Sequence, residues 1–487
     1  LRQAVLSSQP SLPANFPGHR KTLGSMAPPA HIMIILYPAQ GHMLPLIDFT
    51  HQLVLSSNLT VTIVTTPGNL PAISSLLSAH PSSIQTLILP FPSHPSIPPG
   101  IENVRDLGWI GNIYMINALT QLAAPIARWH HAQSDPPVAI ISDFFLGWTK
   151  KLAEKLNIEH FSFNSSGIFF KSISFYCWNH EEIREMKEFK FCDIPGSPSF
   201  KQHELPSLFL LCNTPSPEWK GVREVLIENS LPTNLIMNSF YGLEGRYVDH
   251  LRKQFTDYDV YAVGPLSLRG LDHGTAVKDS EFSPLFEWLD SSPAGSVLYV
   301  SFGSQKYMNQ AQLNAVAMGL EKSGARFVWV VKFQPDECNL PAGFEQRVSG
   351  RGVVLKNWAP QMRILRHRAV GGFMCHCGWN SILEATEAGV SILAWPMEAE
   401  QYVNAMLLET DLMVAVRVCE GSETVPDADH LSAVIRKWSG ESDGALRLRA
   451  SELKDMAFAA VAAGGSSSND MEKLSKRLSQ LVLARHE

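Results

Sequence analysis

Few cysteines, no excess of basic residues and no long apolar run are the first features of this 487-residue sequence. The seven cysteines are odd in number and follow no repeated spacing, which indicates a reducing compartment, the cytoplasm, rather than a disulfide framework. Forty Lys and Arg against forty-six Asp and Glu leave a net charge of −6, unlike the basic balance of a nucleic-acid binder. The apolar runs are shorter than the roughly 18 residues of a membrane helix. We therefore expect neither nucleic-acid binding nor membrane insertion.

The N-terminal segment 1–25 also lacks the apolar core of about 7–15 residues that is typical of a signal peptide. It contains mixed Ser, Pro and basic residues and starts at Leu1. Met26 stands just before the first clear apolar run. We expect residues 1–25 to be a disordered extension or an upstream translation artefact, with Met26 as the natural start.

Short apolar runs alternate with segments of helical periodicity along the rest of the chain. The runs lie at 31–37, 61–65, 138–142, 234–238 and 260–263, and then at 296–301, 326–331, 352–355, 370–374, 391–394 and 413–418. Continuous apolar strands that are separated by helices indicate parallel sheets covered on both faces. The sequence therefore predicts an α/β protein with two doubly wound halves.

A loop-like stretch between the two halves predicts the domain boundaries. Residues 266–283 are rich in Gly and Asp and are expected to form a linker. Residues 26–265 would form the first domain and residues 284–465 the second. A Gly-Gly-Ser-Ser-Ser break at 464–468 precedes a last helix at 471–483. This break would let the final segment, 469–487, dock back on the first domain.

The stretch 358–401 carries the features of a nucleotide-binding unit. It reads WAPQMRILRHRAVGGFMCHCGWNSILEATEAGVSILAWPMEAEQ. Gly378 lies where an apolar strand turns into a helix, and the free N–H groups and dipole at a helix start suit a phosphate. Glu384 follows one turn after Asn380, which suits ribose hydroxyls, and Trp358 is able to stack on a base. Each feature alone is equally typical of an ordinary βαβ unit.

The combination closely resembles the signature box of the plant UDP-dependent glycosyltransferases of secondary metabolism. The matching parts are WAPQ, an H-x-AVGGF strand, HCGWNS, a following Glu, a WP pair and a terminal acidic-Gln pair, over the family's usual length. The resemblance implies the GT-B fold, in which two Rossmann-like doubly wound parallel-sheet domains face each other. It places the acceptor on the domain at 26–265 and the UDP-sugar on the domain at 284–465.

The resemblance also implies roles for individual residues of the donor site. The residues that would contact uracil and ribose are Trp358, Ala359, Gln361 and Glu384. The residues that would bind the diphosphate are His376, Asn380, Ser381 and, in a separate turn, Ser304. The residues that would read the sugar hydroxyls are Trp379, Glu400 and Gln401.

Three positions depart from the family pattern. Cys375 stands where the family commonly has Thr or Ser, and Ser391 replaces a usual Pro. Glu400 replaces a usual Asp, which adds one methylene to a sugar contact. The terminal Gln401 resembles users of UDP-glucose rather than UDP-galactose. The expected donor is therefore UDP-glucose, while the change at Glu400 leaves UDP-xylose and UDP-rhamnose open.

His42 is the expected general base. It lies in the segment Pro38–Pro45, at the carboxyl end of a predicted strand and the start of a helix, where open α/β sheets bind ligands. The positive end of the helix dipole favours the neutral imidazole that a base needs near neutral pH. The family carries its catalytic His in the same G-H-x-x-P setting. Asp143, after the run 138–142, matches the family's orienting carboxylate; as an alternative, it caps a helix.

The implied reaction is a single displacement that inverts the anomeric carbon of the UDP-sugar, with the UDP-sugar as co-substrate and no metal. Two D-x-D strings, 257–259 and 427–429, do not lie where a sugar diphosphate would bind, and the second reads as a helix cap. The Cys-His-Cys string at 375–377 has no second ligand cluster. A serine hydrolase fits less well, because no G-x-S-x-G elbow is present. A NAD-dependent dehydrogenase also fits less well, because no G-x-G-x-x-G loop follows the first strand.

The acceptor is expected to bind loops of the first domain at 90–110, 144–148 and 162–178, which are rich in aromatic residues. Such loops suit a small phenolic or flavonoid acceptor, although they are also able to pack on the core alone. We expect a monomeric O-glycosyltransferase. A nucleotide-sugar-binding protein without catalysis is the alternative, and the presence of both His42 and Asp143 argues against it.

Overall fold

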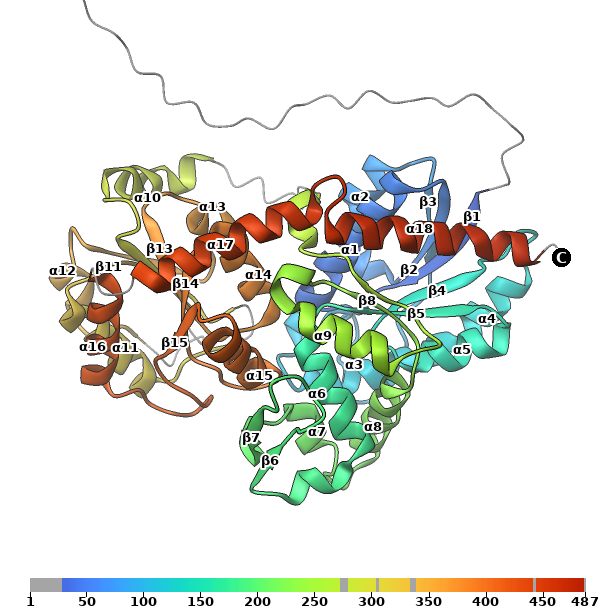
Figure 1. The fold of residues 1–487 in the computed structure, drawn as a ribbon, viewed down its shortest axis with the longest axis horizontal. Helices are drawn as coiled ribbons and strands as arrows, with labels where there is room; N and C mark the ends of the chain where they lie inside the picture. Colours follow the sequence, from blue (N-terminus) through green and yellow to red (C-terminus); the bar gives the residue numbers. More distant parts are fainter. Residues whose placement is uncertain (1–28, 272–278, 304–305, 333–338, 441–443, 486–487) are drawn as a thin grey trace, which may run out of the picture.

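The computed structural model describes residues 29–271, 279–303, 306–332, 339–440 and 444–485. Two parallel sheets lie side by side, and helices cover both faces of each (Figure 1). This arrangement confirms the predicted α/β fold. The expected extension at 1–25 and part of the expected linker lie outside the described residues.

The first sheet has seven parallel strands, and their order places β1 beside β4 at its centre. In sheet order they are β3 (Ile84–Ile88), β2 (Leu59–Thr65), β1 (Ala30–Ile35), β4 (Ala139–Asp143), β5 (Glu159–Asn164), β8 (Asn234–Met237) and β9 (Val260–Ala262). The chain order reverses between β1 and β4. Such a switch point opens a crevice at the carboxyl ends of the two strands, where ligands bind in open α/β sheets.

The second sheet has six parallel strands and a similar reversal between β10 and β13. In sheet order they are β12 (Gly352–Lys356), β11 (Arg326–Val331), β10 (Val297–Val300), β13 (Val370–Cys375), β14 (Ser391–Ala394) and β15 (Ala415–Arg417). A small antiparallel hairpin of β6 (Glu188–Lys190) and β7 (Ser199–Lys201) is attached to the first half.

The helices alternate with the strands, as expected for doubly wound sheets. In the first half they are α1 (Gln40–Ser56), α2 (Ser74–Ala79), α3 (Gly111–Leu119), α4 (Ala123–His131), α5 (Trp148–Leu156), α6 (Ile168–Asn179), α7 (Ser207–Leu211), α8 (Pro217–Ser230) and α9 (Tyr241–Gln254). The second half has α10 (Asp279–Ser291), α11 (Gln310–Ser323), α12 (Phe344–Arg347), α13 (Gln361–Leu365), α14 (Trp379–Ala388), α15 (Gln401–Met406), α16 (Ala428–Ser439) and α17 (Gly444–Val461). Among the described helices, none is long and apolar enough to cross a membrane.

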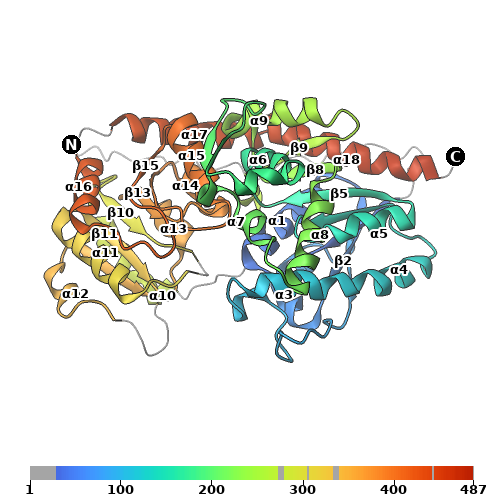
Figure 2. The same ribbon diagram turned by 90° about the horizontal axis from the view of Figure 1, so that it is seen from below.

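The last helix, α18 (Ser466–Arg485), lies against the first sheet rather than the second (Figures 1 and 2). Its apolar side joins the buried cluster of β1, β2 and α1 through Met471, Leu474, Leu478 and Val482. The helix begins at Ser466, earlier than the sequence suggests. The reason is tertiary: the Ser467 hydroxyl donates a hydrogen bond to the carbonyl of Gly264 at 2.6 Å, which holds the predicted flexible serines in the first turn.

The two halves share part of their core. One buried apolar cluster contains residues of both sheets and continues from one half into the other. Residues Leu266–Arg269, at the start of the expected linker, form a short 3-10 helix. There the Ser267 hydroxyl donates a hydrogen bond to the buried carboxylate of Glu387 on α14. The beginning of the linker is thereby bonded to the second half.

Candidate active site

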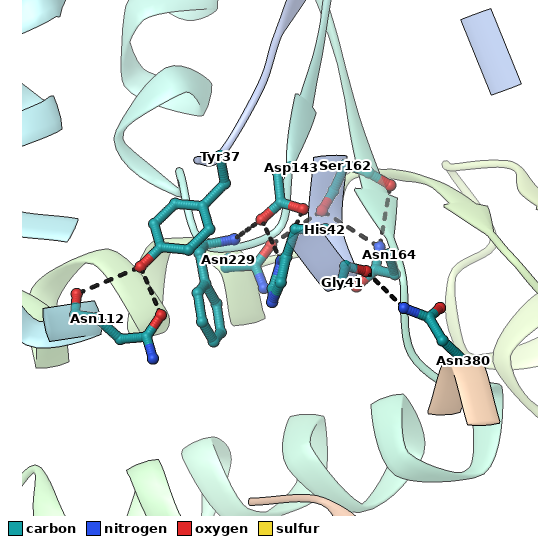
Figure 3. A network of polar contacts seen from close by, with 10 residues as sticks. Tyr37, Gly41, His42, Asn112, Asp143, Ser162, Asn164, Asn229 and Asn380 are labelled. Carbon is teal, nitrogen blue, oxygen red and sulfur yellow. Dashed lines mark hydrogen bonds and ion pairs between the residues drawn. The ribbon is translucent and has the colours of Figure 1, made fainter. Parts of the chain in front are cut away.

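His42 lies in the first turn of α1, which follows the carboxyl end of β1, and its ring is beside Asp143 (Figure 3). Its Nδ1 is 2.9 Å from Oδ2 and 3.1 Å from Oδ1 of Asp143, the last residue of β4. The reversal of strand order therefore brings together two side chains that are 101 residues apart. The Asp143 side chain has no exposed surface, whereas that of His42 is 18% exposed.

The contact with Asp143 determines how the His42 imidazole presents itself. An ionised carboxylate only accepts hydrogen bonds. In the neutral imidazole of His42, Nδ1 therefore carries the hydrogen and donates a hydrogen bond to Asp143. Nε2 then keeps its lone pair. Asp143 Oδ1 also accepts the backbone N–H of Phe145 at 2.8 Å, which fixes the carboxylate. The pair therefore presents an oriented proton acceptor.

Aromatic rings enclose the His42 imidazole. Phe144 stacks on it at 5.1 Å and 18°, and Phe145 lies 4.6 Å away at 39°. Tyr37 packs on it at 5.1 Å, and the Tyr37 hydroxyl donates to Oδ1 of Asn112 at 2.8 Å (Figure 3). Burial, followed by the charge of Asp143, raises the pKa of Tyr37. The rings hold the imidazole in one orientation, and the Tyr37 phenol stays neutral.

A cleft of about 730 Å³ separates the two halves and contains His42. Both halves line it, and ten of the predicted donor-site residues do so: Trp358, Ala359, Gln361, His376, Trp379, Asn380, Ser381, Glu384, Glu400 and Gln401. Ser304 lies outside the described residues. The cleft is large enough for a small-molecule substrate together with part of a nucleotide, since ligand pockets commonly have about 300–1,000 Å³.

Trp358, Gln361 and Glu384 form one end of the cleft. Trp358 is 47% exposed and touches Phe282 edge-on, so one face of its indole is open. Gln361 Nε2 donates to Glu384 Oε2 at 2.5 Å, and the Tyr299 hydroxyl donates to Gln361 Oε1 at 3.2 Å. An open aromatic face beside an oriented carboxylate is suited to a base and its ribose.

His376 lies at the turn between β13 and α14. Burial lowers its pKa to about 4, so the ring is neutral near neutral pH. Its Nδ1 is buried, with no partner among the described residues. Gly303 and Gly378 pack against the ring, where a Cβ would come within 2.8 and 2.6 Å of it. Gly303 also has a φ of +80°, so glycine fits both its conformation and its surroundings.

Two residues of the signature stretch bond the first half across the cleft. Asn380 Nδ2 donates to the carbonyl of Gly41 at 2.9 Å, next to His42 (Figure 3). The Trp379 indole is 2% exposed, and its Nε1 donates to the carbonyl of Asn238 at 2.8 Å. The indole N–H of Trp379 therefore joins the two halves to each other, while the role of Trp379 at the sugar stays a prediction.

Gln401 and Glu400 lie at the start of α15, facing the cleft. Gln401 Oε1 accepts the backbone N–H groups of Met397 and Glu398 at 2.9 and 3.1 Å. Its amide nitrogen is thereby left as the group for a ligand. Burial raises the pKa of Glu400, although hydrogen bonds from the backbone of Glu400 and Trp379 and the proximity of His42 lower it. Glu400 and His42 line the same cleft.

Comparison with known proteins identifies the family. Residues 272–439 match the family described as UDP-glucoronosyl and UDP-glucosyl transferase. UDP-glycosyltransferase 89A2 of Arabidopsis thaliana is 46% identical over 93% of this chain and 97% of its own. This chain belongs to the plant UDP-glycosyltransferases. A flavonol 3-O-glucosyltransferase of Arabidopsis thaliana, UGT89B1, is 43% identical over 91% of this chain and 94% of its own.

A solved plant UDP-glycosyltransferase, UGT89C1 of Arabidopsis thaliana, has the same fold. Its complex with UDP-L-rhamnose matches with a TM-score of 0.74 and 34% identity, over 92% of this chain and 98% of that one. The same protein has also been solved with quercetin. The likeness confirms the GT-B fold, and family membership makes a UDP-sugar the co-substrate.

In this UDP-glycosyltransferase, aspartates of the two D-x-D strings, 257–259 and 427–429, form structural hydrogen bonds. Asp427 caps α16 by accepting the backbone N–H of His430 at 2.8 Å, as the sequence predicts. Asp259 accepts hydrogen bonds from Lys473 at 2.5 Å and from Tyr261 at 2.9 Å. In the described part of the chain, no group of three or more His, Cys, Asp or Glu side chains is arranged to hold a metal ion.

The sequence did not reveal two residues of the first half that form hydrogen bonds with the second half at the cleft of this UDP-glycosyltransferase. Asn238 receives the Trp379 indole, and Ser207 on α7 bonds the loop before Gln401. Neither residue lies in a recognisable motif. No local pattern marks them, because their roles depend on a neighbour more than 100 residues away.

Donor binding by this UDP-glycosyltransferase is expected to weaken in acid through Glu384. Burial raises the pKa of its carboxyl to about 7 from an ordinary 4.5, although the hydrogen bond from Gln361 opposes the shift. Ribose hydroxyls donate best to the ionised form. If only that form binds, the Kd of UDP-glucose measured by calorimetry rises about tenfold between pH 8 and pH 6. UDP-glucose itself keeps the same charge across this range.

Two variants separate Glu384 from other titrating groups. Glu384→Gln is expected to bind UDP-glucose more weakly and with a flat pH profile. His42→Ala is expected to keep the wild-type profile, because His42 lies on the opposite wall of the cleft. A flat profile for the wild-type protein, or an unchanged one for Glu384→Gln, would contradict this assignment.

Proposed function

We propose that this UDP-glycosyltransferase is an inverting O-glycosyltransferase that transfers glucose from UDP-glucose to a hydroxyl of a small phenolic or flavonoid acceptor. The observation that carries the proposal is the His42–Asp143 pair, whose imidazole lines the same cleft as the signature stretch while the carboxylate is buried behind it. We place the acceptor on the first half, 26–265, and the donor on the second, 284–465, with 266–283 as the linker.

His42 is proposed as the general base. Nε2 takes the proton of the acceptor hydroxyl, whose oxygen forms a bond to the anomeric carbon. The bond between that carbon and the β-phosphate oxygen breaks at the same time, and UDP leaves with its electron pair. Attack from the side opposite UDP inverts the anomeric centre. Asp143 stabilises the imidazolium that forms.

The departing diphosphate needs stabilisation from the second half. The N-terminus of α14 has no side-chain cap, and it supplies backbone N–H groups beyond that of Trp379 and the positive end of the helix dipole. We propose that His376, Asn380 and Ser381 add hydrogen bonds there, with Ser304 completing the site. Stabilising the leaving-group charge lowers the barrier for breaking the glycosidic bond.

Glucose is the proposed sugar, and the support comes from the start of α15. Gln401 presents an amide N–H to the cleft, because its carbonyl oxygen is already bonded to the backbone. An N–H donor beside the Glu400 carboxylate suits adjacent sugar hydroxyls. The solved UDP-L-rhamnose complex of UGT89C1 and the additional methylene of Glu400 make UDP-rhamnose the second candidate, and UDP-xylose remains the third.

The acceptor class is supported by the wall of the cleft near His42. Trp109, Phe144, Phe145, Phe170 and Leu208 line this part, which suits a flat aromatic ring. Among the relatives, UGT89B1 is described as a flavonol 3-O-glucosyltransferase, and UGT89C1 was solved with quercetin. We further propose a monomer in the cytoplasm, and the six described cysteines, all free thiols, support the reducing compartment.

The test is a matrix of UDP-glucose, UDP-xylose and UDP-rhamnose against simple phenols, flavonols and terpenoid alcohols, with products detected by mass spectrometry. The proposal expects the highest kcat/KM for UDP-glucose with a phenolic acceptor and a β-linked product. A preference for UDP-rhamnose would favour the second candidate. Donor binding without any product would favour a nucleotide-sugar-binding protein.

Gln401→His is expected to reduce kcat/KM for UDP-glucose by about tenfold or more while UDP affinity stays within twofold. The histidine ring has no carbonyl oxygen to accept both backbone N–H groups of Met397 and Glu398, and it places its own N–H elsewhere than the Gln401 amide does. A lost hydrogen bond costs about 1 kcal/mol or more. Steady-state kinetics with UDP-glucose and calorimetry with UDP measure the two quantities. An unchanged donor profile would remove Gln401 from sugar recognition.

A further inference from the structure

Ser207, the first residue of α7, bonds the second half directly across the cleft. Its hydroxyl accepts the backbone N–H of Ala399 at 2.8 Å, and its own N–H donates to the carbonyl of Ala399 at 3.3 Å. The ring of Tyr402 meets that of His203 nearby, edge-on at 5.8 Å. The segment before and within α7 therefore packs on the loop that leads into α15.

Ala399 occupies a conformation that needs such support. Its φ is +57°, in the left-handed region that costs a non-glycine residue about 1–2 kcal/mol. Such conformations persist where neighbouring contacts stabilise them. Ala399 directly precedes Glu400 and Gln401, so its backbone angles set the direction from which these side chains reach the sugar.

We propose that Ser207 is a positioning residue for the donor sugar. Its hydroxyl holds Ala399 in the left-handed conformation and thereby places Glu400 and Gln401 opposite His42. The inference rests on the proposed function of the cleft. Because Pro206 and Leu208 line the same cleft beside Ser207, the contact also joins the acceptor wall to the loop that reads the sugar.

The geometry separates the effect of Ser207 on the sugar from any effect on the nucleotide. Trp358, Gln361 and Glu384 lie outside the loop at 397–400, and their described hydrogen bonds and ring contacts go to other residues. Loss of the hydroxyl leaves the N–H of Ala399 without its partner, so the loop relaxes. Sugar contacts then weaken, while contacts to uridine stay.

The test compares the Kd of UDP-glucose with the Kd of UDP by calorimetry in wild type, Ser207→Ala and Ser207→Thr. In Ser207→Ala, we expect the Kd of UDP-glucose to rise about fivefold to tenfold, as for the loss of one hydrogen bond, with the Kd of UDP within twofold. The ratio of kcat/KM for UDP-glucose to kcat/KM for UDP-xylose should decrease by a similar factor. Ser207→Thr keeps the hydroxyl and should restore most of both quantities.

Ser216→Ala is the matched control, because its hydroxyl accepts the N–H of Trp219 at the start of α8 and does not cross the cleft. It should lower the unfolding temperature without changing the two affinities. An unchanged ratio of affinities in Ser207→Ala would overturn the proposal, and so would an equal loss for UDP and UDP-glucose. If wild type binds UDP-glucose but yields no glycoside, the proposed function fails while the binding ratios still decide the role of Ser207.

Discussion

His42→Ala is expected to lower kcat by about a hundredfold to ten-thousandfold, the range typical of a lost general base, while the Kd of UDP-glucose stays within twofold. The imidazole is the group in the cleft that Asp143 orients with an open Nε2. The nucleotide-binding residues lie on the other wall, so donor affinity should not depend on His42. Product formation with a phenolic acceptor and calorimetry with UDP-glucose measure the two effects.

A second histidine of the first half provides the control. His80 is buried against His51, with its Nε2 2.7 Å from Nδ1 of His51, and it lies outside the cleft lining. His80→Ala should lower stability and leave kcat nearly unchanged. Turnover retained in His42→Ala would remove His42 as the base. The pH dependence of kcat would then identify another group.

Asp143→Asn is expected to reduce kcat by about a hundredfold or more at unchanged donor affinity, because an amide does not carry the charge that stabilises the imidazolium. The amide of Asn is able either to accept a hydrogen bond from Nδ1 of His42 or to donate one to it. The tautomer with the hydrogen on Nδ1 and an open Nε2 is therefore no longer favoured. Steady-state kinetics of the single variants and of the double variant with His42→Ala measure the coupling. The double variant should be about as slow as His42→Ala alone.

Asp470→Asn is the matched control for this change. Asp470 lies on α18. It accepts a hydrogen bond from the backbone N–H of Ala262 and forms an ion pair with Arg252, each at 2.7 Å. Its loss should affect the docking of α18 and not the chemistry. If Asp143→Asn and His42→Ala reduce kcat independently and their effects multiply, the two residues do not act as one pair.

Much of the fold follows from local pattern, and the exceptions have physical reasons. The sequence predicts two doubly wound halves because fully buried strands such as β10 are continuous apolar runs. It misses β5, whose residues 159–164 alternate polar and aromatic side chains. It also misses β3, an edge strand with partly exposed positions. Both strands form because neighbouring strands pair with them. Those partners are distant in the sequence, so a short segment of the chain does not reveal the pairing.

Most of the predicted donor-site residues share one continuous stretch, which makes their proximity predictable from the sequence. Ten of the predicted residues line one cleft. Trp379 is one of the ten. Its motif indicates a ligand contact, yet its indole binds the carbonyl of Asn238. Whether an N–H faces a substrate or another part of the protein depends on how the two halves meet.

The sequence alone predicted the alternation of strands and helices from periodicity. The proposed donor-binding stretch at 358–401 and the candidate residues His42 and Asp143 were predicted from short motifs that resemble those of the family. Only the tertiary structure decided that His42 meets Asp143 at 2.9 Å, that α18 packs on the first sheet and that Ser207 bonds Ala399. The physical reason is that these contacts join segments far apart in sequence, and only the packing of complete sheets brings such segments within hydrogen-bond distance.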